Sequence, residues 1–216
     1  MIVYGSSLSP FVRKVLVFAA EKGIPVENII PRPHTDEHAE FRKASPFGKI
    51  PALRHNDFTI SDSSAIVTYL DAIGPEPKLI PDDPRARART VWYDEFADTI
   101  LFGTGVKMFF NRIVAPLLFN IEGDLAAAEK AEKEELPPIV DYLESIAPAS
   151  GFLIGDRLTL ADIAVASPWV NFAHLGIAMD PATHPRASAY IAAILARPSF
   201  AGLIANEKAF LASRTG

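Results

Sequence analysis

Residues 1–30 read MIVYGSSLSPFVRKVLVFAAEKGIPVENII, two short β-rich runs on either side of a helical pattern. The first run, Ile2-Val3-Tyr4, predicts a strand. Ser9-Pro10 predicts the start of a helix, because serine is a favoured N-cap and proline fits the first helical position. Lys22-Gly23 closes this helix, and residues 26–30 predict a second strand. A strand, a helix and a strand in so short a segment form a βαβ unit, so the two strands are expected to be parallel.

The pattern continues to about residue 77. A polar helix is expected near residues 36–43, followed by strands at residues 50–53 and 58–60. Asn56-Asp57 lies between these strands and suits a hairpin turn. A further helix is expected from Asp62 to Gly74. Residues 1–77 are therefore predicted to form a βαβ-α-ββα domain.

The second half has no strand pattern. Residues 78–84 belong to a proline-dense segment that we interpret as a linker, and residues 85–216 are predicted to form an all-α domain. One long helix is expected over 85–113, and a second over 123–148, bent at Pro137-Pro138 because proline disturbs a helix interior. Two or three helices are expected between residues 159 and 213. The predicted fold class is α/β followed by all-α.

One helix start in the second half is strongly specified. Thr159 and Asp162 have the spacing of a capping box, and Leu158 and Ile163 are placed for a hydrophobic staple. The residues that follow, 164–169, are nearly all apolar. We therefore expect this helix to lie at the centre of the second core.

The composition excludes several classes of function. The chain has 216 residues, 49% of them hydrophobic, and a net charge of −5, which is unfavourable for general nucleic-acid binding. It has no cysteine, which removes disulfides, thiolate metal sites and catalytic cysteines. His34 and His38 lack the spacing of a metal site with a third ligand, so no metal is expected. The N-terminus does not resemble a signal peptide and the apolar runs are too short to span a bilayer, so we expect a cytoplasmic protein with no membrane segment.

Together, four motifs resemble the cytosolic glutathione transferase family: Ser9-Pro10-Phe11, the segment 48–53 (GKIPAL), Asp62-Ser63-Ser64-Ala65-Ile66, and the segment 158–162 (LTLAD). The resemblance covers the whole chain and is greatest to serine-type members, such as those of the tau, phi, zeta and theta classes. It implies a thioredoxin-like domain that binds glutathione and a helical domain that binds an electrophile and forms the dimer interface.

The resemblance implies that a serine between the first strand and the first helix donates a hydrogen bond to the glutathione sulfur. Ser9 is the first candidate and Ser6 the second. A helix N-terminus favours an anion such as a thiolate, which agrees with this placement. The alternative is that Ser9 only caps the helix.

Glutathione itself would be bound by residues from the other two motifs of the first domain. The resemblance implies a cis bond before Pro51, which lets the backbone of Ile50 pair with the cysteinyl unit. It implies that Asp62-Ser63 bind the γ-glutamyl end, although the family usually has Glu or Gln where this chain has the shorter Asp62. Without the resemblance, Pro51 would only start a strand and Asp62-Ser63 would only cap a helix.

The glycyl carboxylate of glutathione is the remaining group to be bound. Lys49 is a candidate for it, with an exposed loop lysine as the alternative. His38, from the second helix, is a further candidate.

The second domain would supply the rest of the site. Phe102, Phe109 and Phe110 could line the electrophile pocket, or could simply be core residues. Phe47 lies where many family members place an aromatic side chain that inserts into the partner subunit, which predicts a two-fold homodimer.

The predicted function is conjugation of glutathione to a hydrophobic electrophile. Glutathione-dependent isomerase, lyase or dehalogenase activity, or a non-catalytic glutathione-binding or dimerising module, are the alternatives. The absence of cysteine excludes the thiol–disulfide branches of the family. It also opposes a redox thioredoxin-fold or chloride-channel-like protein.

Overall fold

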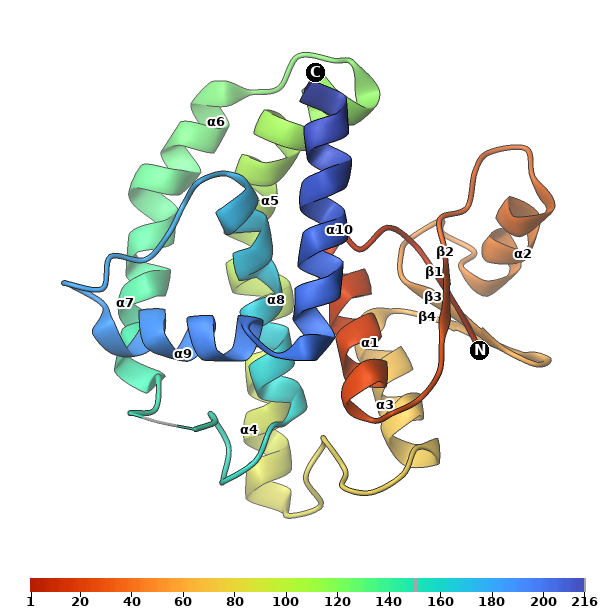
Figure 1. The fold of residues 1–216 in the computed structure, drawn as a ribbon, viewed down its shortest axis with the longest axis horizontal. Helices are drawn as coiled ribbons and strands as arrows, with labels where there is room; N and C mark the ends of the chain where they lie inside the picture. Colours follow the sequence, from red (N-terminus) through yellow and green to blue (C-terminus); the bar gives the residue numbers. More distant parts are fainter. Residues whose placement is uncertain (150, 216) are drawn as a thin grey trace.

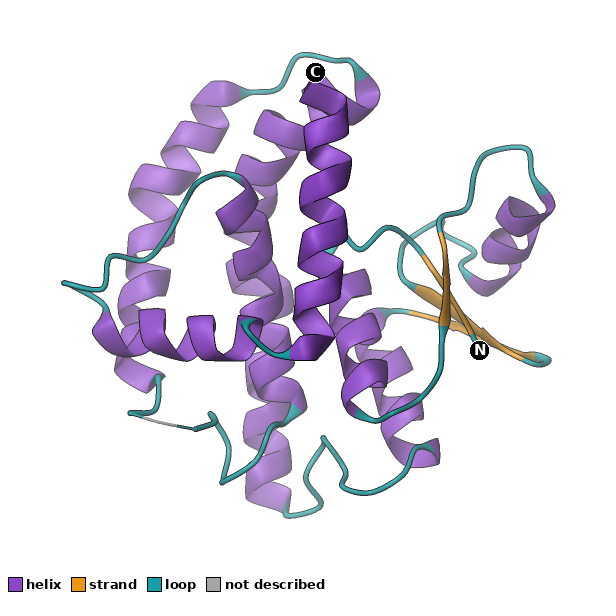
Figure 2. Cartoon of the chain, viewed as in Figure 1, coloured by secondary structure: helices purple, strands orange, loops and turns teal. Residues whose placement is uncertain are grey.

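The computed structural model describes residues 1–149 and 151–215, and its first part is a small mixed sheet with three helices (Figures 1 and 2). The elements follow the predicted order: β1 (Ile2–Tyr4), α1 (Pro10–Glu21), β2 (Glu27–Ile29), α2 (Asp36–Ala44), β3 (Ala52–His55), β4 (Phe58–Ser61) and α3 (Ser63–Ile73). The sheet order is β2-β1-β3-β4, with β1 and β2 parallel and the other pairs antiparallel. This is a thioredoxin-like arrangement, as predicted.

The two faces of the sheet are covered by different helices. Successive side chains of a strand point to opposite faces. Accordingly, Val3 packs into the main core with α1 and α3, whereas Tyr4 packs against Phe41 of α2. Figure 1 shows α1 and α3 between the sheet and the rest of the molecule, with α2 on the far side. The N-terminus of α1 therefore faces the second half of the chain.

The only regular elements among the described residues of the second half are helices. Its elements are α4 (Pro84–Glu95), η1 (Phe96–Leu101), α5 (Phe102–Phe109), η2 (Phe110–Phe119), α6 (Leu125–Lys130), η3 (Ala131–Glu135), α7 (Leu136–Ile146), α8 (Leu160–His174), α9 (Pro185–Leu195) and α10 (Pro198–Thr215). The segments η1, η2 and η3 are π-helical, and turns of this kind frequently occur at functional sites.

Two of the predicted helices differ from the observed ones in their bounds. The first long helix runs without a break from Pro84 to Phe119, further than the expected 85–113. The second covers residues 125–146, and Pro137-Pro138 lie in the first turn of α7, directly after the π-helical η3. The loss of a proline N–H is tolerated in a first turn, so the irregularity lies before the prolines.

The helix α8 is the centre of the second core. Every residue from Leu160 to Phe172 is buried, and α1, α4 and α9 pack around it. The predicted capping box is present: the Asp162 carboxylate accepts the Thr159 N–H at 2.8 Å. The long helix Pro84–Phe119 is apolar and long enough to cross a membrane by length and composition alone. It packs against α8 in this structure, with 33% of its apolar stretch buried.

Candidate functional site

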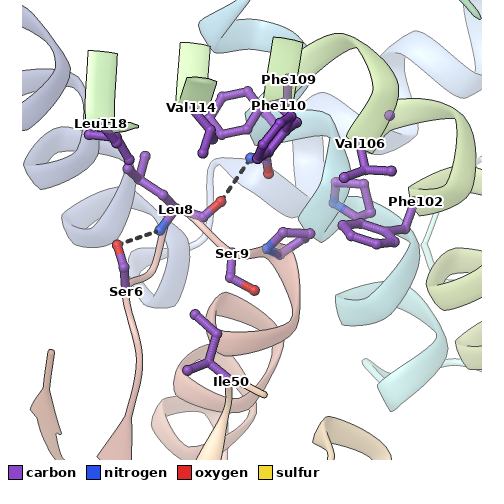
Figure 3. Close-up of a pocket in the computed structure, with 14 residues that line it drawn as sticks. Ser6, Leu8, Ser9, Ile50, Phe102, Val106, Phe109, Phe110, Val114 and Leu118 are labelled. Atoms are coloured by element: carbon purple, nitrogen blue, oxygen red, sulfur yellow. Dashed lines mark hydrogen bonds between the residues drawn. The ribbon is translucent and has the colours of Figure 1, made fainter. Parts of the chain in front are cut away.

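An apolar pocket of about 250 Å³ lies where the N-terminus of α1 meets the long helix (Figure 3). Its walls include aromatic and aliphatic side chains of α5 and η2, among them Phe102, Phe109 and Phe110. The polar residues in its lining are Ser6, Ser9 and Asn171. The part of the wall contributed by η2 is π-helical.

Ser9 is the N-cap of α1, yet its side chain makes no capping hydrogen bond. The residue is half-buried and lines the apolar pocket at the positive end of the helix dipole. Ser6 lines the same pocket, but its hydroxyl oxygen accepts the Leu8 N–H at 3.3 Å. Of the two predicted serines, Ser6 is thus bonded to the loop backbone, whereas Ser9 makes no capping hydrogen bond to α1.

A second pocket of about 480 Å³ lies beside the first and is more polar. Its lining includes five of the six predicted binding residues, namely Lys49, Ile50, Pro51, Asp62 and Ser63. The Ile50–Pro51 peptide bond is cis.

The two pockets adjoin. Ile50 lines both of them, and the rings of Phe11 and Phe102, one from each pocket, lie 4.4 Å apart. The structure does not bring His38 to either pocket: it lies on α2 with its ring 6.1 Å from that of Phe41.

Asp62 adopts a backbone conformation that is rare for a residue with a side chain, with φ at 84° and ψ at 131°. Its carboxylate accepts the N–H groups of Ser64 and Ala65 at 2.9 and 3.1 Å and so caps α3. Such backbone positions cost about 1–3 kcal/mol and concentrate at binding sites. The conformation turns Asp62 into the lining of the polar pocket.

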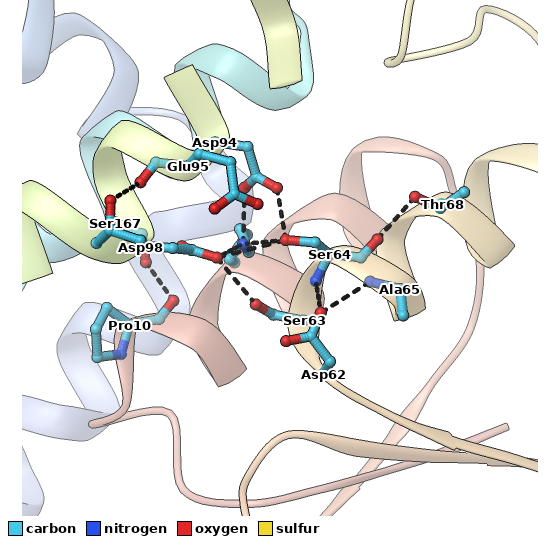
Figure 4. A network of polar contacts seen from close by, with 12 residues as sticks. Pro10, Asp62, Ser63, Ser64, Ala65, Thr68, Asp94, Glu95, Asp98 and Ser167 are labelled. Carbon is cyan, nitrogen blue, oxygen red and sulfur yellow. Dashed lines mark hydrogen bonds and ion pairs between the residues drawn. The ribbon is translucent and has the colours of Figure 1, made fainter. Parts of the chain in front are cut away.

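Sequence reasoning missed a buried lysine, Lys14. It binds two carboxylates, Asp94 and Asp98, which Figure 4 shows facing Ser63 and Ser64. The ammonium of Lys14, on α1, lies 2.7 Å from Asp94 and 2.6 Å from Asp98. The Ser64 hydroxyl donates to Asp94 at 2.6 Å, and the Ser63 hydroxyl lies 3.4 Å from Asp98. Asp98 lies in the π-helical η1 and lines the polar pocket. Through Asp98, η1 connects the helical half of the chain to the Asp62-Ser63 motif.

The pKa of Asp98 is raised, although a lysine partner usually lowers the pKa of a carboxylate. Burial raises its pKa from 3.8 to about 6, and the negative charges of Asp94 and Asp62 act in the same direction, against the opposing effect of Lys14. Between pH 3.8 and 6 the folded chain therefore binds more protons at this site than the unfolded chain. The contribution of Asp98 to the free energy of unfolding falls as the pH rises through this window.

We expect the substitution Asp98→Asn to remove this pH dependence. Relative to the variant, the wild-type chain should lose about 2–3 kcal/mol of unfolding free energy between pH 4 and pH 6.5. Urea unfolding of both proteins at several pH values measures the difference. Asp57→Asn, at an exposed carboxylate in the hairpin turn, is the control. Parallel pH profiles for wild type and Asp98→Asn would contradict the expectation.

Comparison with known proteins places this architecture, a thioredoxin-like sheet followed by a helical domain, in one family. Residues 3–78 match the model of the glutathione S-transferase N-terminal domain, and residues 110–207 match that of the C-terminal domain. The chain belongs to the glutathione S-transferase family, as its motifs predicted.

Individual relatives agree with this assignment. A glutathione S-transferase of Hyoscyamus muticus is 30% identical over 211 residues, covering 94% of this chain and 97% of its own length. A maleylacetoacetate isomerase of Rattus norvegicus is 28% identical and covers 87% of this chain and 84% of its own. The crystal structure of a glutathione S-transferase from Rhodospirillum rubrum F11 has a TM-score of 0.81 at 27% identity, covering 94% of this chain and 90% of that one.

Proposed function

We propose that this chain is a serine-type glutathione transferase that joins the glutathione thiolate to a neutral, apolar electrophile in the cytoplasm. The observation that carries the proposal is the pair of adjoining pockets that share Ile50, one polar and one apolar. Glutathione in the polar pocket would present its sulfur where the apolar pocket begins. Holding two reactants in this relation can make a large contribution to the rate.

Glutathione is proposed to bind along the polar pocket. Its cysteinyl unit pairs with the backbone of Ile50, and its γ-glutamyl end lies against Asp62-Ser63, where a carboxylate and a hydroxyl suit an ammonium and a carboxylate. Asp98, in the same lining, adds a second acidic group for the ammonium. Lys49 is the proposed partner of the glycyl carboxylate. The position of His38 outside both pockets does not support a binding role for it.

Ser9 is the proposed donor to the sulfur. Its hydroxyl is not used in capping α1, and it lies at the helix N-terminus beside Ile50 in the apolar pocket. Both the hydrogen bond and the helix dipole stabilise the thiolate over the thiol. Ser6 is the second candidate, because it lines the same pocket.

The lining of the apolar pocket supports a neutral electrophile. Among the described residues that line it there is no charged side chain, and the Asn171 amide already donates to Leu8 and accepts from Arg13. A maleylacetoacetate-type substrate carries carboxylates, which are costly to bury without partners. This pocket therefore favours conjugation of apolar compounds over isomerisation of acidic ones.

A comparison of two substrates tests the proposal. We expect a neutral activated aryl halide to be turned over with a kcat/KM at least about tenfold above that of a maleyl dicarboxylate, because each unpaired buried charge costs more than 1.4 kcal/mol. Val106→Lys, which places a cation in the pocket wall, should lower or reverse this ratio. Leu125→Lys, at an exposed site on α6, is the matched control. Preference of the wild type for the dicarboxylate would support the isomerase alternative, and glutathione binding without turnover of either would support a carrier.

We further propose a two-fold dimer of chains that each consist of a glutathione-binding domain (1–77), a linker (78–84) and a helical domain (85–216). Phe47 supports the dimer, because its side chain is 88% exposed beside the polar pocket. Val91, Trp92 and Ile100 are large exposed apolar residues on α4 and η1. Exposed apolar groups of this kind commonly mark an interface.

A further inference from the structure

The loop between β1 and α1, residues 5–9, contains three serines, and they differ in surroundings. Ser6 and Ser9 line the apolar pocket. Ser7 does not, and its hydroxyl is one of the groups that lower the pKa of Glu207, a residue of the last helix, α10. Glu207 is 2% exposed, so the C-terminal helix places a buried carboxylate directly beneath the loop.

Two further side chains fix this carboxylate. Arg13, on α1 and fully buried, donates to Glu207 through Nε at 3.1 Å and through Nη2 at 2.8 Å. His174, at the end of α8, lies 2.9 Å from Oε2 of Glu207. A bidentate guanidinium–carboxylate pair has a defined orientation as well as a favourable energy. Glu207 is thus held in one place by α1 and α8 at the same time.

The same cluster also holds the backbone of the loop. Arg13 donates to the Ser167 carbonyl at 2.7 Å and to the Asn171 side chain at 2.9 Å. Asn171 in turn donates to the Leu8 carbonyl at 2.8 Å, and the Ser167 hydroxyl donates to the Pro10 carbonyl at 2.8 Å. The carbonyls of the residues before and after Ser9 are therefore bound by two side chains of α8. Arg13 holds both of these α8 residues through its own hydrogen bonds.

The charges in the cluster favour this arrangement. Burial alone would raise the pKa of Glu207, but the hydrogen bond from His174, the charge and hydrogen bonds of Arg13, and the hydrogen bond from Ser7 lower it below its usual value. Glu207 is therefore ionised at neutral pH and balances Arg13. A buried pair of this kind contributes little stability compared with an apolar pair, but its bidentate geometry fixes the orientation of the groups bound to it.

We propose that Glu207 and Ser167 are positioning residues: together with Arg13 they hold the 5–9 loop so that the Ser9 hydroxyl faces the glutathione sulfur. In this arrangement α10, none of whose described residues lines either pocket, sets the geometry of the thiolate donor. The catalytic part of this inference rests on the proposed function, whereas the part that concerns loop order does not.

Two substitutions test the proposal. Glu207→Gln keeps the shape of the side chain but removes its charge, and Ser167→Ala removes the hydrogen bond to the Pro10 carbonyl without changing any charge. We expect amide hydrogen exchange of residues 6–9 to become faster in both, with kcat lowered by about threefold in Glu207→Gln and by less than that in Ser167→Ala, because neither change removes the Ser9 hydroxyl itself. The KM for glutathione should change less than about twofold, since the polar pocket is untouched.

Glu21→Gln is the matched control. The Glu21 carboxylate also joins α1 to the start of α10, because it accepts two hydrogen bonds from Arg197, the residue before α10, at 2.8 and 2.7 Å. It lies at the opposite end of α1 from the 5–9 loop. Its substitution should leave loop exchange and kcat unchanged. Equal acceleration of loop exchange in Glu21→Gln, or unchanged exchange and kcat in folded Ser167→Ala and Glu207→Gln, would overturn the proposal. If wild type forms no thiolate, the proposed function fails while the exchange measurement still decides the loop-ordering claim.

Discussion

In the Ser9→Ala variant, bound glutathione should no longer ionise near neutral pH. Its thiol pKa is expected to rise from about 6.5 to about 8.5, the value of a free thiol, because the hydroxyl donor is lost. At pH 7 the thiolate fraction would then fall from roughly 75% to roughly 3%. This 25-fold change follows from the assumed two-unit shift and is the largest effect on function that the site predicts.

The rate should fall by less than the thiolate fraction does. A more basic thiolate is a better nucleophile, by a factor of about 8 for two pKa units at a Brønsted slope near 0.45. Ionisation alone therefore accounts for only about a threefold loss of kcat at pH 7. A larger loss would measure what Ser9 contributes by orienting the sulfur toward the electrophile.

Titration with glutathione from pH 5 to pH 9, followed by the ultraviolet absorbance of the thiolate, measures the shift directly. Ser6→Ala is the matched control from the same loop, and it should retain the thiolate. If Ser6→Ala loses the thiolate and Ser9→Ala keeps it, the donor role passes to Ser6. Glutathione that binds to wild type without ionising would favour a carrier, and no binding at all would favour a dimeric scaffold.

The largest effect on stability is expected from Asp162→Ala. The Asp162 carboxylate is fully buried and accepts four hydrogen bonds, from the N–H groups of Leu153 and Thr159 and from the hydroxyls of Thr159 and Tyr190. Alanine removes the Asp162 half of the capping box of α8 and leaves several buried donors without a partner. The free energy of unfolding should fall by about 4 kcal/mol, from the broken capping box and the unsatisfied donors together.

Urea or thermal unfolding of the two proteins checks this value. Asp124→Ala is a suitable comparison, because Asp124 is an exposed N-cap that accepts the Ala127 N–H at 2.9 Å. Its loss should cost only about 1 kcal/mol. Similar losses in both variants would mean that the Asp162 network adds nothing to an ordinary cap.

Much of this architecture could be predicted because its signals are local. The serine and proline that start α1, the Asn56-Asp57 hairpin and the Thr159–Asp162 capping box each depend on residues a few positions apart, and all three are present. Asn56 has a φ of 57°, which asparagine tolerates in a tight turn. The end of the long helix at Phe119 could not be predicted in this way, since π-helical turns depend on packing against other helices.

The ionic clusters behind the pockets were missed for a similar reason. Their partners are far apart in sequence: Lys14 binds Asp94 and Asp98, and Arg13 binds Glu207. One signal was present, since Arg13-Lys14 interrupt a helix that is otherwise apolar on nearly every side. Two cations in such a helix have to be buried, and buried cations need acidic partners. Which acids they are could not be deduced without the fold.

The adjacent cations of α1 also restrict how this protein can be recombined. Arg13 and Lys14 are 0% and 1% exposed, and their carboxylate partners all belong to the helical half. A chimera that joins residues 1–77 to the helical half of another protein would bury two uncompensated charges unless the recipient offers acids at three matching positions. Exchange of a whole domain would therefore destabilise the protein with most partners. Single substitutions along α5 and η2 are a more practical way to change which substrates it accepts.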